Sequence, residues 1–428
     1  MNVEIEKEQT KVKNDSSFTK SLFLNRSFIA IFFSQACVYL GDQFLIVALS
    51  WTVAQEMGGF SLGLVLAAWS IPRGILLFIG GVFADRYERK KMGMIIAGSV
   101  SLVALLIACL IINEWFYLPL WIGTAIILGT LDALRLPLGA SLVPLVLPKA
   151  EIINANRWIQ LLEYGSLSAG AAIAGIVVAS VGSMGAFIII GCLFIVSIIF
   201  FSLLPTLPPN RETQENMVQD LKEGFKWVIS ERRLRVLLPT FALANLFVLG
   251  IYSVGIVLFA KNIAGNGAQN LGFMSSSFGI GLVVGILILP VVPKKVANSL
   301  AGLFMLFLLS DISLALIGLG GNLLAACGFY FLSGLFAGPA STLYRSSLQL
   351  FTPDHLLGRV NSIARGISFG LEPVSTSIIG ALSSILSAGT LIIVGGFAAA
   401  TVDTLGVLTG RLVEKKDNAK EEFSETIN

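Results

Sequence analysis

Ten ionisable residues lie inside long apolar stretches of this chain, and they are the residues most able to do chemistry there. A charged side chain at the centre of a lipid bilayer costs about 2.5–3.5 kcal/mol or more, unless it has a partner or faces water. We therefore expect each of them to be paired or to line a wet cavity. They are Asp42, Arg73, Asp132, Arg135, Glu163, Asp311, Arg345, Arg365, Glu372 and Asp403.

Asp132, Arg135 and Glu163 are the candidates for proton coupling. Asp132 and Arg135 are three residues apart, so they share a helix face. Glu163, on the next expected helix, reaches about the same depth. In such an acid–base–acid cluster one carboxylate can take a proton while the other stays paired. A static salt-bridge network that pins two helices together is the alternative interpretation.

The first apolar stretch carries a polar stripe made of Gln35, Tyr39 and Asp42, at positions i, i+4 and i+7. A stripe of this kind is expected to face a water-filled cavity. Asp42 lies within possible reach of Arg73 on the second stretch, and the pair is a candidate for substrate binding or coupling. Plain helix pairing is the alternative.

Three further residues are candidate substrate ligands. Glu372 precedes Pro373, where a helix bend frees a backbone carbonyl, and it can bind a cation. Asn245 and Tyr252 are seven residues apart and share one helix face. Aromatic residues in such helices also serve simply as packing, so both interpretations remain open for Tyr252.

The elements that position these residues are predicted to be membrane helices. Of the 428 residues, 55% are hydrophobic and 13% are charged, whereas soluble domains carry about 25% charged residues. Segments of roughly 20 apolar residues are long enough to cross a bilayer. Twelve are expected, near residues 28–53, 61–84, 92–112, 117–143, 158–182, 184–204, 236–260, 271–293, 298–319, 321–346, 361–384 and 388–410.

Charge gives the expected orientation and domain organisation. Of the 29 Lys and Arg residues, 24 lie in the tails and loops of one side, and Lys261 alone lies in a loop of the other. The positive-inside rule places both tails in the cytoplasm of a cell-membrane protein. The predicted order is a tail (1–27), a six-helix bundle (28–204), a cytoplasmic loop (205–235), a second six-helix bundle (236–410) and a tail (411–428). The loop is either an amphipathic surface helix or a solvated linker.

The two halves resemble each other. When the sequence is shifted by 205 residues, Gly175 coincides with Gly380, and Asn156 with Asn361. A glycine often marks a position where the backbone conformation requires it. A coincidence of glycines is therefore stronger evidence of a repeat than a coincidence of leucines. Parallel six-helix repeats are typical of transporters whose substrate site lies between the halves.

The stretch "GGVFADRYERKK", residues 80–91, places charge between two apolar segments. We expect a tight cytoplasmic turn, in which glycine permits close helix approach and an acid accepts hydrogen bonds at a helix start. The predicted gating residues are Gly81, Asp85, Arg86, Arg89 and Lys90. A topology anchor would explain the basic residues but not their spacing from the glycine and the aspartate.

This loop resembles the signature of the major facilitator superfamily, G-x-x-x-D-R-x-x-R-K. The segments "RLPLGASLVPLVLPKAEIINAN" and "LGRVNSIARGISFGLEP" are similar to its drug:proton antiporter branch, which includes bacterial macrolide efflux pumps and some siderophore exporters. In place of the branch's usual G-P-x-x-G-G the chain has "GAAIAG", with Ala171 at the proline position. The resemblance implies an all-α membrane protein of two six-helix bundles, alternating access between them, and a gate at the Asp85 loop.

The leading functional expectation is proton-coupled efflux of a hydrophobic or cationic small molecule, such as a drug, a macrolide or a siderophore-like compound. A lipid flippase or a solute importer on the same fold is the alternative. An enzyme is not expected, because the chain has a single histidine, His355, no metal-ligand spacing and no phosphate-binding loop. The expected partners are the small-molecule substrate, protons and lipid. No cofactor, metal or nucleic acid is expected. We expect the protein to be a monomer.

Overall fold

The computed structural model describes residues 22–86, 88–148, 151–206, 217–263, 267–297, 299–353 and 356–427. These residues form helices and no strands. The N-terminal half consists of α2 (Arg26–Glu56), α3 (Gly58–Arg86), α4 (Arg89–Ile112), α5 (Leu118–Val146), α6 (Ile152–Gly165), the π-helical turn η1 (Ser166–Gly170) and α7 (Ala171–Ser202).

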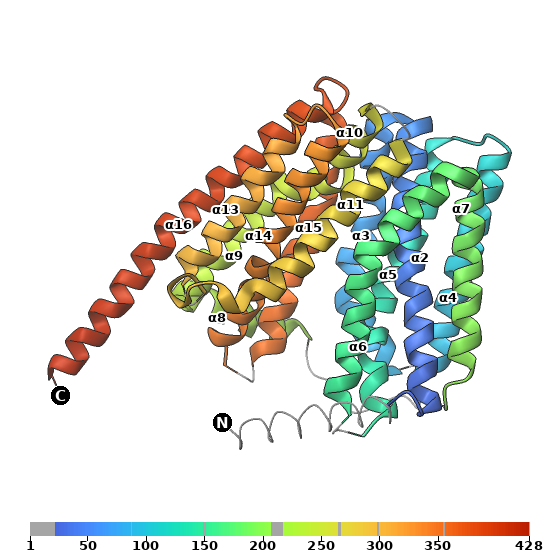
Figure 1. Cartoon of the computed structure of the whole chain (residues 1–428). Helices are drawn as coiled ribbons and strands as arrows, with labels where there is room; N and C mark the ends of the chain where they lie inside the picture. Colours follow the sequence, from blue (N-terminus) through green and yellow to red (C-terminus); the bar gives the residue numbers. More distant parts are fainter. Residues whose placement is uncertain are drawn as a thin grey trace, which may run out of the picture.

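The C-terminal half begins with the short helix α8 and forms the second bundle (Figure 1). Its elements are α8 (Met217–Ser230), α9 (Arg232–Gly250), the π-helical turn η2 (Ile251–Gly255), α10 (Ile256–Asn262), α11 (Gly267–Ile288), the 3₁₀ turn η3 (Leu289–Val291), α12 (Lys294–Ala297), α13 (Leu300–Ile317), α14 (Leu323–Leu350), α15 (Leu357–Leu382) and α16 (Ala388–Ile427).

The described helices are consistent with twelve membrane crossings. Ten spans are long and apolar enough by length and composition. One of them, Trp158–Ser202, has 45 residues, about 68 Å of helix, which is twice the bilayer core. Gly182, with φ 76° and ψ 170°, breaks it into two crossings. α15 is helical and is not among the ten spans; counted with their crossings, it would make twelve.

Side-chain caps fix where several helices begin. The Asn25 side chain accepts from Ser27 N at 3.0 Å at the start of α2. Ser299 accepts from Gly302 N at 2.9 Å at the start of α13, and Asn322 accepts from Ala325 N at 2.9 Å at the start of α14. Each cap satisfies a backbone donor that the helix itself cannot.

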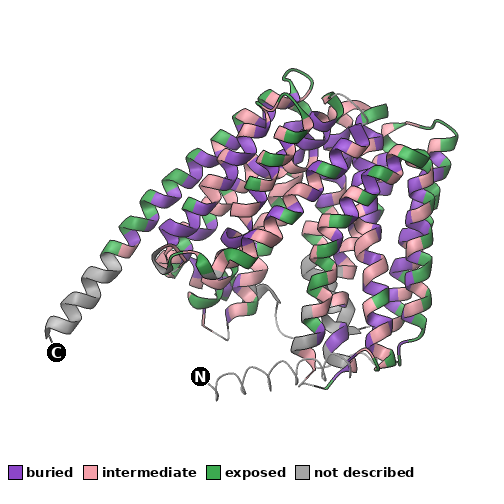
Figure 2. Cartoon of the chain, in the orientation of Figure 1, coloured by how far each residue is buried: buried purple, intermediate pink, exposed green. Residues whose placement is uncertain are grey.

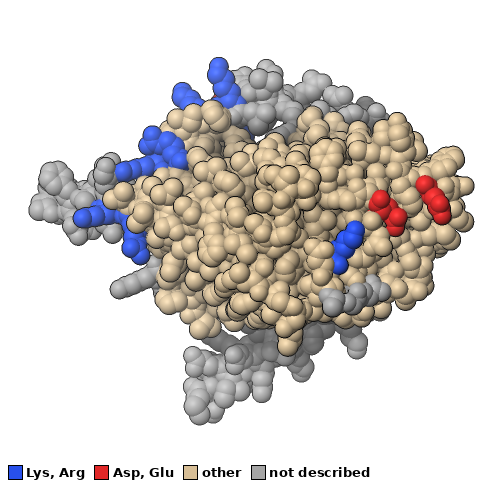
Figure 3. All heavy atoms as spheres, turned by 90° about the horizontal axis from the view of Figure 1, so that it is seen from above, with Lys and Arg blue, Asp and Glu red and all other residues tan. Residues whose placement is uncertain are grey.

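The outer helix surfaces are apolar, as expected for contact with lipid. Leu102 of α4 is 69% exposed and Leu287 of α11 is 71% exposed. Figure 2 shows exposed residues along the outward sides of the helices. Most of the described surface seen in Figure 3 belongs to residues other than Lys, Arg, Asp and Glu. We therefore treat the chain as a multi-pass membrane protein.

The cores of the two bundles are joined at one end only. The largest core cluster contains residues of both bundles, for example Leu49 of α2 and Leu271 of α11. Two smaller clusters lie in separate bundles, one around Phe304 and one around Phe28 and Leu142. Figure 1 shows the bundles diverging toward the end where α6 and α8 lie. We call this the parted end and the opposite one the joined end.

Two antiparallel helix pairs connect the bundles through glycines. An added Cβ at Gly63 of α3 would lie 2.7 Å from the Cα of Gly380 on α15. One at Gly175 of α7 would lie 2.8 Å from the Cα of Gly272 on α11. Gly175 and Gly380 are the positions that coincide in the 205-residue shift. The internal repeat therefore places equivalent glycines at the two contacts between the bundles.

The connection between the bundles contains an amphipathic helix and is not a plain linker throughout. In α8 the Trp227 Nε1 donates to the Phe351 carbonyl at 3.1 Å, while Phe225 and Ile229 are 57% and 51% exposed. At the C-terminal end α16 continues as helix to Ile427, through the segment that was expected to be a tail.

Candidate functional site

Three carboxylates and two guanidinium groups form one continuous chain of ion pairs, which we call the charge chain. Arg135 Nη2 lies 2.8 Å from Asp42 Oδ2 and 2.6 Å from Asp132 Oδ1. Arg73 Nη1 lies 3.5 Å from Asp132 Oδ2, and its Nη2 lies 2.7 Å from Glu372 Oε2. Acids and bases alternate along it, so every guanidinium group touches two carboxylates.

The charge chain is built by close helix packing in the N-terminal bundle. Gly129 of α5 lies against the Trp69 carbonyl of α3, where a side chain would collide with backbone. These helices run in the same direction, so one turn further along Asp132 lies beside Arg73. α2 runs antiparallel to α5, which brings Asp42 to Arg135.

The charge chain crosses from one bundle to the other at Arg73. Gly74 lies against the Phe369 carbonyl of α15, and an added Cβ would sit 3.2 Å from its oxygen. This close approach lets Arg73 reach Glu372 and place its guanidinium carbon 4.4 Å from the centroid of the Phe369 ring. A cation over an aromatic face is favourable, more so away from water.

The electrostatics of this site favour uptake of one positive charge. The exposed fractions of the five side chains range from 13% for Asp132 to 24% for Arg73, so water screens their interactions only partly. When all five are ionised, the carboxylates outnumber the guanidinium groups by one. The Arg73 Nε is buried without a hydrogen-bond partner in the described structure. A proton or a cationic group would balance the remaining negative charge.

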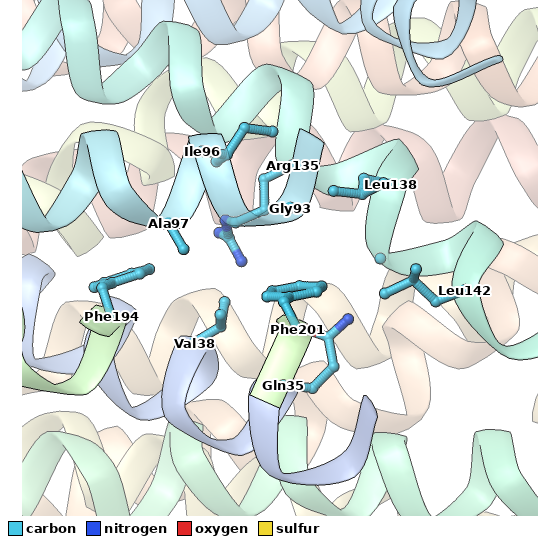
Figure 4. A pocket seen from close by; sticks show the side chains of 11 residues that line it. Gln35, Val38, Gly93, Ile96, Ala97, Arg135, Leu138, Leu142, Phe194 and Phe201 are labelled. Atoms are coloured by element: carbon cyan, nitrogen blue, oxygen red, sulfur yellow. The ribbon is translucent and has the colours of Figure 1, made fainter. Parts of the chain in front are cut away.

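A pocket inside the N-terminal bundle adjoins the charge chain. It lies between α2, α4, α5 and α7, and its lining is mostly apolar. Arg135 points into it from α5, and Gln35 lies across it on α2 (Figure 4). Gln35 is 6% exposed, so it belongs to the interior of one bundle. The structure does not place it between the two bundles.

Two expected pairings are wrong. Asp42 pairs with Arg135, where the sequence suggested Arg73. The second acid that contacts Arg135 is Asp42, whereas Glu163 on α6 is exposed and has no ion pair with Arg135 or Asp132 in the described residues. The role of Asp132, Arg135 and Glu163 in proton coupling stays a prediction. The face that each helix turns inward could not be read from spacing alone.

Of the remaining candidates, Tyr39 lies within electrostatic reach of Arg135 and Asp42 in the charge chain, whereas Asn245 and Tyr252 belong to the C-terminal bundle. Tyr39 is half-buried on α2, one turn before Asp42. In the C-terminal bundle Asn245 is half-buried on α9, and the Tyr252 hydroxyl lies 3.4 Å from the Ser333 hydroxyl. Tyr252 also packs against Phe278, with ring centroids 5.3 Å apart. Tyr252 is thus held within its own bundle.

The expected gating loop is described only in part. Gly81 and the side chains of Asp85 and Arg86 lie outside what the structure describes, apart from their backbone, which belongs to α3. Arg89 is buried at the start of α4. The Lys90 Nζ donates to the Leu204 carbonyl at 2.7 Å, so it supplies a cation just past the end of α7, where the helix dipole favours positive charge.

Two contacts were missed by sequence reasoning. Phe369 lies under Arg73, and the Lys261 Nζ at the end of α10 donates to the Ala54 carbonyl of α2 at 2.9 Å. The second contact links the bundles at the joined end. Lys261 as the only basic residue in a loop of its side was a usable signal, but its partner is a backbone oxygen, which no sequence pattern marks.

A polytopic helical fold with a charged centre linking two pseudo-repeat bundles defines a membrane transporter. The sequence pattern of the Major Facilitator Superfamily matches residues 31–371. The chain belongs to this superfamily, whose members are transporters and not enzymes.

Curated relatives and solved structures agree with this family. The enterobactin exporter EntS of Escherichia coli O1:K1 / APEC is 24% identical over 356 residues, covering 78% of this chain and 79% of that protein. The Shigella flexneri EntS is 25% identical over 342 residues, covering 78% of each chain. The POT family transporter PepTSo superposes with a TM-score of 0.70 at 13% identity, covering 91% of this chain and 99% of that one. The nucleoside transporter NupG has a TM-score of 0.69 at 14% identity, with coverages of 90% and 98%. The structural likenesses show the fold alone.

Proposed function

We propose that this protein is a proton-coupled exporter that moves a hydrophobic or cationic small molecule across the cell membrane by alternating access. The observation that supports it best is the charge chain, which ends on Glu372 of the second bundle and carries one more acid than base. Its charge is rebalanced by either a proton or a cationic substrate. These two ligands therefore compete for the same carboxylates, which is the basis of exchange.

The proposed coupling step is the release of Arg73 from Glu372. A proton on Glu372 removes the negative charge that attracts Arg73 Nη2, now 2.7 Å away. Asp132 on the same bundle then becomes the main partner of Arg73. The contact between α3 and α15 weakens at this level, and the equilibrium shifts toward a state in which the joined end separates. The rearrangement of Arg73 changes the ion pair between Asp132 and Arg135, and through Arg135 it also affects Asp42.

Export is favoured by the orientation and by the relatives. If the Lys- and Arg-rich side is cytoplasmic, with both termini on it, the parted end faces the cytoplasm. An exporter binds its substrate from that side. The relatives named above are enterobactin exporters, which supports efflux of a siderophore-type or drug-like molecule. In this proposal Gln35, Tyr39, Asn245 and Tyr252 contribute to the substrate path, and the loop around Asp85 gates the cytoplasmic side.

The test is transport by the purified protein in lipid vesicles with an imposed pH gradient. Inside-out orientation and a panel of fluorescent dyes, macrolides and siderophores identify a substrate. The expected result is gradient-dependent accumulation that Asp132→Asn lowers by at least about tenfold, because the substitution removes the one carboxylate in excess of the two guanidinium groups and the link between Arg73 and Arg135. Glu56→Gln, an exposed acid at the end of α2, is the matched control and keeps wild-type accumulation.

The same experiment separates the alternatives. Accumulation in the opposite direction under the same gradient identifies an importer. Movement of a labelled phospholipid between leaflets, without accumulation of any soluble compound, identifies a lipid flippase. Equal rates with and without the gradient, in both wild type and Asp132→Asn, refute proton coupling. Rates that scale linearly with protein diluted into single-copy vesicles support the proposed monomer.

A further inference from the structure

Two acidic residues in the C-terminal bundle belong to no part of the charge chain. Asp311 of α13 is 5% exposed and Asp403 of α16 is 1% exposed. Their carboxyl groups lie within electrostatic reach of each other. Neither is paired with a Lys or Arg within the described structure. This is unlike the three acids of the charge chain, each of which touches at least one arginine.

Close packing of α13 on α16 seals this pair away from water. The two helices run antiparallel, and glycines bring them together on either side of the acids. An added Cβ at Gly396 would lie 2.8 Å from Ala315, and one at Gly406 would lie 2.7 Å from the Phe304 ring. The Asp403 Oδ2 is buried and has no hydrogen-bond partner in the described residues. A fully ionised pair would thus hold two buried negative charges without a Lys or Arg partner in the described residues.

One further titratable group faces the pair from a neighbouring element. The Tyr252 hydroxyl of η2 lies within electrostatic reach of both carboxyl groups. It is 3.4 Å from the Ser333 hydroxyl, which lies 3.2 Å from the Ser310 hydroxyl beside Asp311. Ser310 and Ser333 are almost wholly buried, whereas Tyr252 is half-buried. This row of hydroxyl groups leads from the vicinity of the acids to a partly exposed residue.

We propose that Asp311 and Asp403 form a proton-binding site in which one carboxylic acid and one carboxylate share a proton inside the C-terminal bundle. Two adjacent carboxyl groups in an apolar interior cannot both ionise, because each charge disfavours the other and neither is solvated. A shared proton gives one oxygen a hydrogen to donate and leaves a single negative charge. The site holds whether or not the charge chain carries protons during transport.

The test is infrared spectroscopy of the purified full-length protein in lipid vesicles at neutral pH. The expected result is a carbonyl band of a protonated aspartic acid, identified by its shift in heavy water and by carboxyl-13C aspartate labelling. Asp311→Asn combined with Asp403→Asn removes that band. Each single substitution preserves side-chain size and shifts or removes the band. The single variants therefore test the proton-binding site if the double variant does not fold.

Three results would overturn the site. They are a wild-type spectrum without such a band, a band unchanged in both single variants, and a band that is kept by the folded double variant and lost in Asp132→Asn. The last result would assign the proton to the charge chain. Because the readout is a vibration of the protein itself, it does not depend on substrate or transport, and a failed transport assay leaves it unaffected.

Discussion

Arg73 and Glu372 are 299 residues apart in the sequence, and their side chains meet at 2.7 Å across the boundary between the two bundles. The antiparallel register of α3 and α15 brings them together, because Gly63 meets Gly380 and Gly74 meets Phe369 on the same helix pair. In the equivalent pair, α7 with α11, the 205-residue shift places Phe278 opposite Leu167. The repeat therefore duplicates the packing of the bundles but not their charges.

Arg73→Lys is expected to show whether transport needs only the positive charge of Arg73 or also the geometry of its guanidinium group. Arg73 uses two different nitrogens to hold one carboxylate from each bundle, which a lysine ammonium on a flexible stem does poorly. Gradient-driven transport in vesicles should fall by about tenfold or more, and Arg73→Gln should fall further. Equal activity of Arg73→Lys and wild type would show that charge alone suffices.

Asp132→Asn and Glu163→Gln are expected to differ. Asp132 touches both arginines, while Glu163 is exposed without an ion pair in the described structure. Proton-coupled transport should be lost in the first variant and largely kept in the second, with both proteins present in the membrane in equal amounts. Loss in Glu163→Gln alone would return the coupling role to the residue that the sequence suggested.

Gly380→Ala is expected to impair the joined end. A Cβ there would lie 2.7 Å from the Cα of Gly63, and overpacking of this kind costs about 1–3 kcal/mol. Transport should fall because one of the two states of the cycle is disfavoured. Gly370→Ala is the matched control on the same helix, since a Cβ there meets no atom within 4 Å. Similar losses in both variants would contradict the role of the contact.

Lys261→Gln is expected to loosen the joined end without unfolding the protein. The Lys261 ammonium donates to the Ala54 carbonyl at the end of α2, a contribution of about 0.3–1 kcal/mol at a helix C-terminus. A single cysteine introduced as Ala54→Cys, at a position that is 0% exposed, with the native cysteines replaced, should react with a water-soluble maleimide up to about fivefold faster. Lys222→Gln, an exposed lysine of α8, should leave the rate unchanged.

Much of the fold follows from composition and spacing. Apolar segments of membrane-spanning length imply helices, because lipid offers no partner for unpaired backbone groups. Glycine at Gly182 predicted the turn that divides α6–α7 into two crossings. The identities of Asp132, Arg135, Asp42, Arg73 and Glu372 were found from charge in an apolar setting, since the cost of burial makes each such residue conspicuous.

The sequence by itself determined that these charges must be paired, and the tertiary structure decided with whom. Spacing fixes neighbours three or four residues apart on one helix, as for Asp132 and Arg135. It leaves free the rotation of each helix about its axis and the register between helices. Packing of Gly129 on Trp69 and of Gly74 on Phe369 settles both for α3, which is why Arg73 meets Asp132 and reaches Glu372 in the other bundle.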